Sequence, residues 1–288
     1  MELKQAREYL KWQNEILEVR VEERTREMLE LQQVEFELRS AKERIDYELN
    51  LAAQIQKSIL PSTFPAFPQH KEFDIYAMML PAQEIGGDFY DFFLVEDEHL
   101  VVIIADVAGK GVPAALFMMN TRTTFRSIAK QLKSPSEVLT EANDLLCVGN
   151  ETGMFVTAII AYYHLPTGLL TYSNGGHSPP LLSVAENTYR ELGQTHGSVL
   201  GGKSGIAYRE DVHQFEPGQT LILYTDGVTE ARSPNNEFFG LGRLKNFLAT
   251  CNTPNVSEMC HQLDKSLKNF QQGDQFDDLT VLALRRKV

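Results

Sequence analysis

The chain has 288 residues, 43% of them hydrophobic, which is enough for one large domain with a sizeable core and an accessory segment. Its formal net charge of −12 and its pI near 5.1 oppose non-specific binding to nucleic acid or to anionic lipid, because both carry the same negative charge. The three cysteines lack C-x-x-C spacing and the charged N-terminus lacks a long apolar run, so the sequence predicts a cytoplasmic protein without disulfides, thiolate zinc or membrane insertion.

The first 60 residues predict one long helix. They contain no Gly or Pro and are rich in Glu, Arg, Gln and Leu, so a helix of roughly 85 Å is expected at about 1.5 Å per residue. An apolar residue recurs at every seventh position of this helix, interrupted only by Arg24 and Ala52. The recurring residues are Leu3, Leu10, Leu17, Leu31, Leu38, Ile45 and Ile59.

A second apolar seam runs beside this repeat and changes phase. It lies four residues after the first seam at Val21 and Met28, and three residues after it at Val34, Ala41 and Ile55. A helix cannot bury such a stripe alone, so the pattern predicts a coiled-coil homodimer through residues 1–60. The alternative is that the helix packs on the domain that follows it, above all over residues 50–60.

Beyond the helix, the sequence predicts an α+β domain. Pro61, Pro65 and Pro68 end the helix, which divides the chain into residues 1–60 and 61–288. Strands are expected at Phe73–Leu80, Phe89–Val95, Leu100–Val107, Phe155–Leu165, Leu169–Ser173, Thr220–Tyr224 and Thr280–Leu284. Helices are expected at Val112–Leu132, Pro135–Val148, Leu241–Ala249 and Val256–Phe270. Because strands follow one another directly and helices come in pairs, antiparallel sheets covered by helices are favoured over a doubly wound parallel sheet.

Acidic residues stand at the ends of several apolar strands. They are Asp88 in EIGGDFYD, Asp106 in VVIIADVAGKGVPAA, Asp226 in LILYTDGVTEA, and the pair Asp277 and Asp278 in QFDDLTVLAL. Asp and Gly end strands in many proteins through turn chemistry. A buried strand that runs straight into a carboxylate is costly, however, unless the charge meets water, a partner or a metal. Carboxylates that converge without His or Cys suit Mg²⁺ or Mn²⁺.

These segments resemble the PPM metal-dependent protein phosphatases, specifically the SpoIIE/RsbU-like branch. The resemblance covers roughly residues 50–286, and the motifs occur in the family's order. They are A-x-x-I-Q-x-S-I-L-P at 52–61, GGDFYD at 86–91, DVAGKGVPAA at 106–115, NGGHSPP at 174–180, YTDGVTEA at 224–231 and DDLT at 277–280.

The resemblance implies a β-sandwich with helices on both outer faces and two divalent metal ions, Mn²⁺ or Mg²⁺, in the cleft between the sheets. It implies Asp88, Asp106, Asp226 and Asp277 as carboxylate ligands, with the Val107 carbonyl as a further ligand. Asp278 is the alternate for Asp277. Asp91 is either an outer hydrogen-bond acceptor or a solvated turn residue. The implied reaction is attack of metal-bound hydroxide on phosphorus, with no covalent intermediate.

The chain departs from the broader family at two places. Ala108 stands where eukaryotic members carry a His proposed as general acid, so the leaving-group proton donor is unassigned. Residues 81–83 stand where an upstream phosphate-binding Arg is found, and Lys110 or Arg122 is the candidate replacement. His177 in NGGHSPP is interpreted as a turn residue bonded to backbone rather than as a catalytic group.

The resemblance therefore predicts a serine/threonine phosphoprotein phosphatase. It implies a phosphorylated protein substrate, such as an anti-sigma-factor antagonist in a bacterial partner-switching pathway, and an upstream sensor or receiver domain or protein acting through the N-terminal helix. Two alternatives remain. One is a catalytically silent pseudophosphatase binding module; the other is a diguanylate cyclase, suggested by GGDFY, in which Phe89 replaces an acidic residue of the cyclase signature.

Overall fold

The computed structural model describes residues 2–131, 133–185, 188–251, 253–273 and 275–287. The chain divides into two compact units, residues 1–52 and residues 53–288. No helix in the described ranges is both long and apolar enough to cross a bilayer. The functional division into residues 1–60 and 61–288 stays a prediction, and its end residues Met1 and Val288 lie outside the described residues.

Helix α1 runs from Glu2 to Ile59 as one helix of 58 residues, in agreement with the sequence prediction. Most of its predicted seam is exposed: Leu10 and Leu17 are each 60% exposed, and Leu31 is 70% exposed, whereas Ile59 is partly buried and packs against the core of the second unit. The last turns of α1 belong to the second unit. There the helix ends directly before Leu60, which is buried in the core of that unit.

The second unit is built on two five-stranded sheets whose paired strands are all antiparallel. Sheet A has the order β1 (Phe73–Leu80), β10 (Leu279–Arg286), β9 (Thr220–Tyr224), β6 (Leu181–Ala185) and β7 (Thr188–Glu191). Sheet B has the order β2 (Phe89–Val95), β3 (His99–Val107), β4 (Val156–His164), β5 (Leu169–Gly175) and β8 (Asp211–Gln214).

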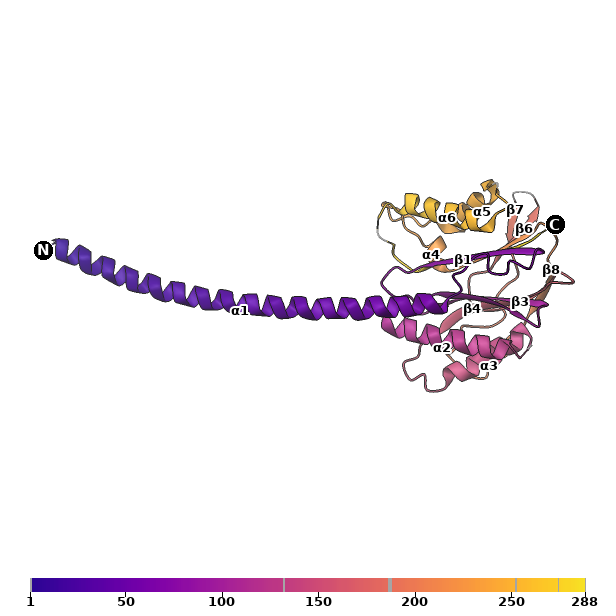
Figure 1. Cartoon of the computed structure of the whole chain (residues 1–288), viewed down its shortest axis with the longest axis horizontal. Helices are drawn as coiled ribbons and strands as arrows, with labels where there is room; N and C mark the ends of the chain where they lie inside the picture. The colour runs from indigo at the N-terminus through magenta and orange to yellow at the C-terminus, as the bar shows by residue number, and fades with distance from the viewer. Residues whose placement is uncertain (1, 132, 186–187, 252, 274, 288) are drawn as a thin grey trace. The chain divides into compact units, whose positions relative to one another are not determined.

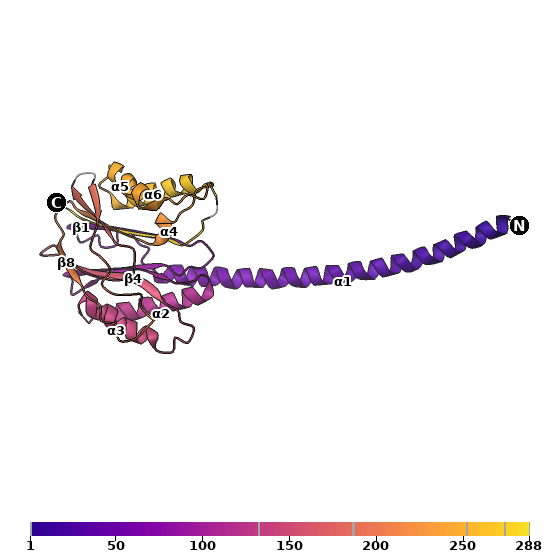
Figure 2. The same cartoon turned by 180° about the vertical axis from the view of Figure 1, so that it is seen from behind.

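Helices cover the outer face of each sheet (Figure 1). Helices α2 (Val112–Ala129) and α3 (Pro135–Cys147) contact strands of sheet B, and α5 (Gly240–Thr250) and α6 (Val256–Gln271) contact strands of sheet A. A short helix, α4 (Asp226–Thr229), follows β9. The view from behind shows the same four layers (Figure 2).

Burial on both faces of the central strands explains their continuous apolar sequences. In β9, Leu221 and Leu223 belong to the core shared by the two sheets and by α2 and α3, whereas Ile222 and Tyr224 belong to the core beneath α5 and α6. A strand covered on both sides needs apolar residues at every position, not only at alternate ones. The β-sandwich with helices on both faces, preceded by a long helix, is therefore confirmed.

The sequence missed the short elements. Strands β6, β7, β8 and helix α4 were not predicted, and β7 and β8 are four-residue strands whose residues are mostly exposed. Such strands lack the apolar pattern on which the prediction depends. Helix α2 ends at Ala129, and its predicted end, Leu132, lies outside the described residues.

Candidate active site

Four of the predicted carboxylates converge from the two sheets. Sheet B contributes Asp88, directly before β2, and Asp106 near the end of β3. Sheet A contributes Asp226, which follows β9 by two residues, and Asp277, which precedes β10 by two. Their charges act on one another: Asp226 and Asp277 both raise the pKa of Asp106, and Asp106 raises the pKa of Asp88.

Burial and the charges of neighbouring carboxylates raise the pKa values of three members of the cluster, Asp88, Asp106 and Asp226. Burial is the larger cause at Asp88, which is 2% exposed and whose pKa lies well above its usual value. Burial and then the charge of Asp226 raise the pKa of Asp106 to about 7. A cluster of this kind is stabilised by a cation that neutralises the shared negative charge.

Lys110 is the cation found next to the cluster. Its Nζ lies 3.0 Å from Asp277 Oδ1 and donates a 2.7 Å hydrogen bond to the Phe276 carbonyl. Its charge also lowers the pKa of Asp226, which burial, then Asp277 and Glu230, raise. The structure thus brings Lys110 to the carboxylates, as a phosphate-binding candidate requires.

Two threonines that the sequence did not single out hold Asp88 in place. Thr225 Oγ1 and Thr280 Oγ1 each donate a 2.7 Å hydrogen bond to Asp88 Oδ2. Thr225 and Thr280 also bond to each other's backbone, which joins the end of β9 to the start of β10. The signal was present in YTDG and DDLT, where a threonine lies beside each acidic motif, but a single threonine is not informative.

Asp278 is held by two backbone amides, and its charge also acts on the cluster, where it raises the pKa values of Asp88 and Asp106. Its Oδ1 accepts from the Ala82 amide at 2.8 Å, and its Oδ2 accepts from the Gly87 amide at 2.8 Å. Two glycines leave room for Asp278: a Cβ on Gly86 would meet its carboxylate Oδ2 at 2.2 Å, and one on Gly227 would meet its backbone carbonyl oxygen at 1.9 Å. These glycines are therefore required by packing.

A third glycine leaves room for the Val107 carbonyl. A Cβ on Gly87 would lie 2.8 Å from Val107 O, closer than such atoms normally approach. Gly87 precedes Asp88, and Val107 follows Asp106. The close approach of these two segments brings a backbone oxygen of β3 beside the chain that carries Asp88.

The chemical type of the oxygen donors fits a hard divalent cation, although the side chains are not already arranged around a metal position. In the described part of the chain, no three His, Cys, Asp or Glu side chains are already arranged as a metal-binding group. What converges is a set of carboxylate oxygens with a backbone carbonyl nearby, the ligands that Mg²⁺ and Mn²⁺ prefer. The carboxylates share one neighbourhood, and the raised pKa values of Asp88, Asp106 and Asp226 indicate that the neighbourhood favours a cation.

Asp91 and Arg122 lie together in a different place. Asp91, on β2, is fully buried, and its carboxylate is 3.1 Å from Arg122 Nη2 and 2.6 Å from Arg126 Nη1. Both arginines are on α2, and Arg126 also lies over the Phe93 ring. Asp91 is thus neither solvated nor in a turn, and its contact with Arg122 is an ion pair between strand and helix.

His177 links the two sheets through neutral hydrogen bonds. Its Nδ1 lies 2.7 Å from Thr157 Oγ1 on β4, and its Nε2 lies 3.1 Å from the Tyr224 carbonyl at the end of β9. Because Thr157 pairs with Asp106 and Tyr224 precedes Asp226 by two residues, both contacts are next to the cluster. Burial lowers the pKa of His177 to about 4, which agrees with its interpretation as a structural residue bonded to backbone.

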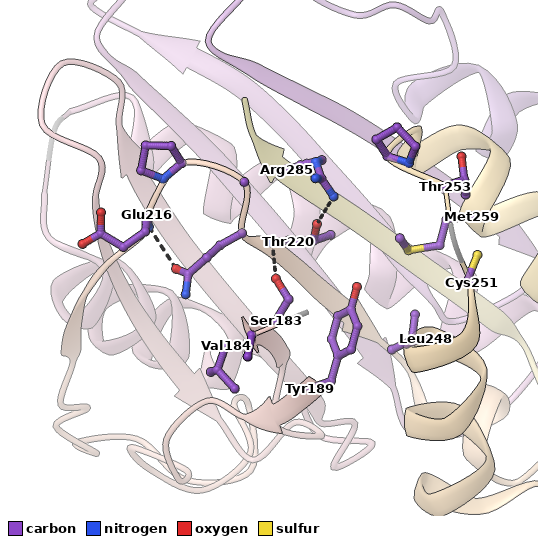
Figure 3. A pocket seen from close by; sticks show the side chains of 15 residues that line it. Ser183, Val184, Tyr189, Glu216, Thr220, Leu248, Cys251, Thr253, Met259 and Arg285 are labelled. Carbon is purple, nitrogen blue, oxygen red and sulfur yellow. Dashed lines mark hydrogen bonds between the residues drawn. The ribbon is translucent and has the colours of Figure 1, made fainter. Parts of the chain in front are cut away.

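A separate cavity of about 650 Å³ lies against sheet A, and none of its lining residues belongs to the carboxylate cluster (Figure 3). Arg285, Thr220 and Tyr189 line it, with Leu248 and Met259 on the side of α5 and α6. Arg285 Nη1 donates a 3.2 Å hydrogen bond to Thr220 Oγ1. The chemistry of the carboxylates is therefore not in this cavity.

Comparison with known proteins identifies the relatives of this chain. The family model described as "Stage II sporulation protein E (SpoIIE)" matches residues 96–287. "Phosphoserine phosphatase RsbU" of Bacillus subtilis (strain 168) is 32% identical over 252 residues, which cover 87% of this chain and 73% of that protein.

Solved structures share the fold. The "SiaA-PP2C domain of Pseudomonas aeruginosa" superposes with a TM-score of 0.75 at 23% identity, covering 85% of this chain and 98% of that one. "RsbX in complex with magnesium" superposes with a TM-score of 0.57 at 19% identity, covering 75% of this chain and 96% of that one.

Proposed function

This chain belongs to the SpoIIE family of PP2C-type serine/threonine protein phosphatases, and we propose that it uses Asp88, Asp106, Asp226 and Asp277 to hydrolyse phosphoserine or phosphothreonine on a protein. The observation that carries the proposal is the convergence of these four carboxylates from both sheets beside Lys110. The diguanylate cyclase alternative is not supported, because the matching family and the relative with 32% identity are phosphatases.

PP2C-type phosphatases are metal-dependent, and the residues proposed to hold two ions, Mn²⁺ or Mg²⁺, are the four aspartates with the Val107 carbonyl. Bound there, such ions would supply an activated water and charge neutralisation for the phosphoryl group. Asp277 is preferred to Asp278 because the Asp278 carboxylate is already bonded to two backbone amides. Thr225 and Thr280 fix the Asp88 carboxylate, so that it keeps one orientation toward the cluster.

Lys110 is the residue proposed to orient the phosphate. It sits at the edge of the cluster with a partly exposed ammonium group, where a substrate oxygen can reach it. Arg122 is less suited to this role, since it is 13% exposed and paired with Asp91. With Ala108 in the position of the eukaryotic histidine, no side chain is assigned as the general acid.

The test is Mn²⁺-dependent release of phosphate from a phosphoserine protein by the wild type and by Asp226→Asn. We expect turnover that requires the metal and falls by at least about a hundredfold in the variant, because a ligand charge is lost at the centre of the site. Matched thermal unfolding curves serve as the folding control. No turnover with any divalent metal would support the pseudophosphatase alternative instead.

We further propose a cytoplasmic homodimer that acts on an anti-sigma-factor antagonist and is controlled by a sensor or receiver through residues 1–60. The exposed apolar seam of α1 supports pairing with a second helix. Control would reach the site through ordering or rotation of the paired helices, which would complete the metal site. The proposal fails if removal of residues 1–50 leaves both the oligomeric state and the phosphatase activity unchanged.

A further inference from the structure

A group of cations and aromatic rings lies at the border of the carboxylate cluster, and we call it the cation–aromatic rim. It consists of Lys110, Arg232, Phe238 and Phe276. Lys110 Nζ lies 4.6 Å from the centre of the Phe276 ring, and the Arg232 guanidinium carbon also lies 4.6 Å from it. Since Phe276 precedes Asp277, the rim is continuous with the proposed metal ligands.

Arg232 is held rigidly in the rim. It forms an isolated antiparallel bridge with Phe238, and its guanidinium carbon lies 4.9 Å from the centre of the Phe238 ring. Its Nη1 donates a 3.0 Å hydrogen bond to Asn236 Oδ1. Stacking on two aromatic rings restricts the guanidinium to one orientation, so little conformational entropy remains to be lost when it binds a ligand.

The charge of Arg232 is not neutralised by an ion pair within the described residues, whereas neighbouring cations are neutralised. Lys110 pairs with Asp277, and Arg243, on α5, pairs with Glu237 at 3.2 Å. Within the described chain, Arg232 forms no ion pair with a carboxylate, and its Nε is buried without a hydrogen-bond partner. The side chain as a whole is only partly buried, so the Nη groups are the part of the guanidinium that can meet a carboxylate or phosphate ligand.

The aromatic members of the rim are open to solvent. Phe276 is 55% exposed and Phe238 is 47% exposed. Exposed phenylalanines that flank a cation form a surface with apolar contact area and one positive charge, which is the composition of a protein-binding site rather than of an ordinary solvated face. The chain as a whole carries a net charge of −12, so the positive charge at the rim comes from these particular side chains and not from the general composition.

We propose that the cation–aromatic rim binds an acidic segment next to the phosphorylated residue of the protein substrate, with Arg232 as its specificity-determining residue. The inference rests on the proposed phosphatase function. Lys110 contacts Asp277 directly and is the rim cation nearest the phosphoryl site, whereas Arg232 lies on the rings of Phe276 and Phe238 and meets the neighbouring part of the substrate. The occupant is therefore a carboxylate side chain flanking the phosphoserine or phosphothreonine.

The experiment measures binding separately from turnover. Two fluorescein-labelled phosphoserine peptides of equal length, one flanked by Glu and one by Lys, are titrated with the full chain carrying Asp226→Asn, with Mn²⁺ present, and followed by anisotropy. We expect tighter binding of the Glu peptide. Adding Arg232→Gln should weaken its binding about tenfold, as for the loss of one charge-assisted hydrogen bond, and should change binding of the Lys peptide much less.

Arg243→Gln is the matched control, because it removes the same charge from an arginine that is also stacked, over Phe270 at 5.1 Å, but already paired with a carboxylate. It should leave the difference between the peptides unchanged. Phe276→Leu, at an exposed position, should reduce that difference by removing the ring under Arg232. Thermal unfolding of each variant establishes that it is folded.

Three results would overturn the rim as the acidic-segment site. They are no measurable binding of the Glu peptide, equal weakening of both peptides by Arg232→Gln, and the same effect from Arg243→Gln. Failure of the wild type to release phosphate from either peptide would count against the phosphatase proposal alone, because the binding titration does not depend on turnover.

Discussion

The buried ion pair of Asp91 allows an effect on the stability of the fold to be distinguished from an effect on the active site. Asp91 lies three residues after Asp88, within the motif GGDFYD, and the sequence left it open as an outer hydrogen-bond acceptor of the site or a solvated turn residue. The structure instead joins the Asp91 carboxylate to Arg122 and Arg126 across the interface between β2 and α2. We predict that Asp91→Asn destabilises the fold and spares the affinity of the site for metal.

The size of the effect follows from burial. Breaking a buried ion pair costs about 3 to 5 kcal/mol, because the remaining charge stays in the interior without its partner. Asp91 is fully buried, but the Arg126 side chain is 32% exposed and can regain some hydration, so the lower end, about 3 kcal/mol, applies. For a domain of this size, that loss corresponds to a fall in Tm of about 6 to 12 °C.

The assay combines thermal unfolding of the full chain with a titration of Mn²⁺-dependent activity at a temperature where the variant is folded. Asp97→Asn is the control, since Asp97 is an exposed residue of the β2–β3 turn with φ of 55°, a conformation that Asn also tolerates. An unchanged Tm together with a large rise in the Mn²⁺ concentration needed for activity would refute the assignment and return Asp91 to the metal site.

Three other changes test the surroundings of the cluster. Gly86→Ala should lower the free energy of unfolding by about 1 to 3 kcal/mol and reduce activity, because the new Cβ would displace the Asp278 carboxylate from the backbone amides that donate to it. An unchanged Tm and rate would contradict this. Gln56→Leu should cost a similar amount in denaturant unfolding, because the side chain of Gln56 donates to the Gly86 carbonyl at 2.6 Å and accepts from the Gly86 amide at 3.1 Å. Gln56→Glu should cost no less, because it keeps the acceptor but sets a buried carboxylate oxygen against the Gly86 carbonyl; wild-type stability of either variant would contradict this. Burial lowers the pKa of His177 from 6.5 to about 4, so its contribution to stability, about 3 kcal/mol, is complete above pH 6.5 and is lost as the pH falls toward 4. The Tm of the wild type should therefore fall more steeply over that range than the Tm of His177→Gln, and equal slopes would show that His177 does not titrate in this way.

The sequence could predict those parts of the fold in which the type of each residue indicates whether that residue is buried. Central strands such as β3 and β9 are apolar at nearly every position because helices and a second sheet cover both faces, and that run is visible without a structure. The same applies to the site: an aspartate at the end of a buried strand stands out because its charge is out of place. Asp88, Asp106 and Asp226 were found in this way.

What the sequence could not predict depends on pairs of residues that are distant in the chain. Nothing near Asp91 in the sequence indicates that two arginines of α2 neutralise it, since the pairing depends on the register of α2 over β2. The contacts of Thr225 and Thr280 with Asp88 likewise span more than a hundred residues. In such cases the residue type permits many partners, and only the packing of sheet against sheet, or of helix against sheet, selects one.

The position of the cluster makes its geometry depend on the alignment of the two sheets. Asp88 and Asp106 move with sheet B, and Asp226 and Asp277 move with sheet A. Two sets of hydrogen bonds join the sheets at this place, the threonine bonds to Asp88 and the bonds of His177 to Thr157 and Tyr224.

Gln56 adds a third constraint, because it fixes Gly86 two residues before Asp88. If the proposed metal site is assembled from both sheets, small shifts in any of these three contacts would alter it, since metal ligands must be held within fractions of an ångström. The contact from Gln56 is the one of the three that originates in α1, in the helical segment that directly precedes the linker. We therefore expect a signal that reorders this segment to act on Gly86 and, through it, on the position of Asp88, and to lower the affinity of the proposed site for metal without unfolding the domain.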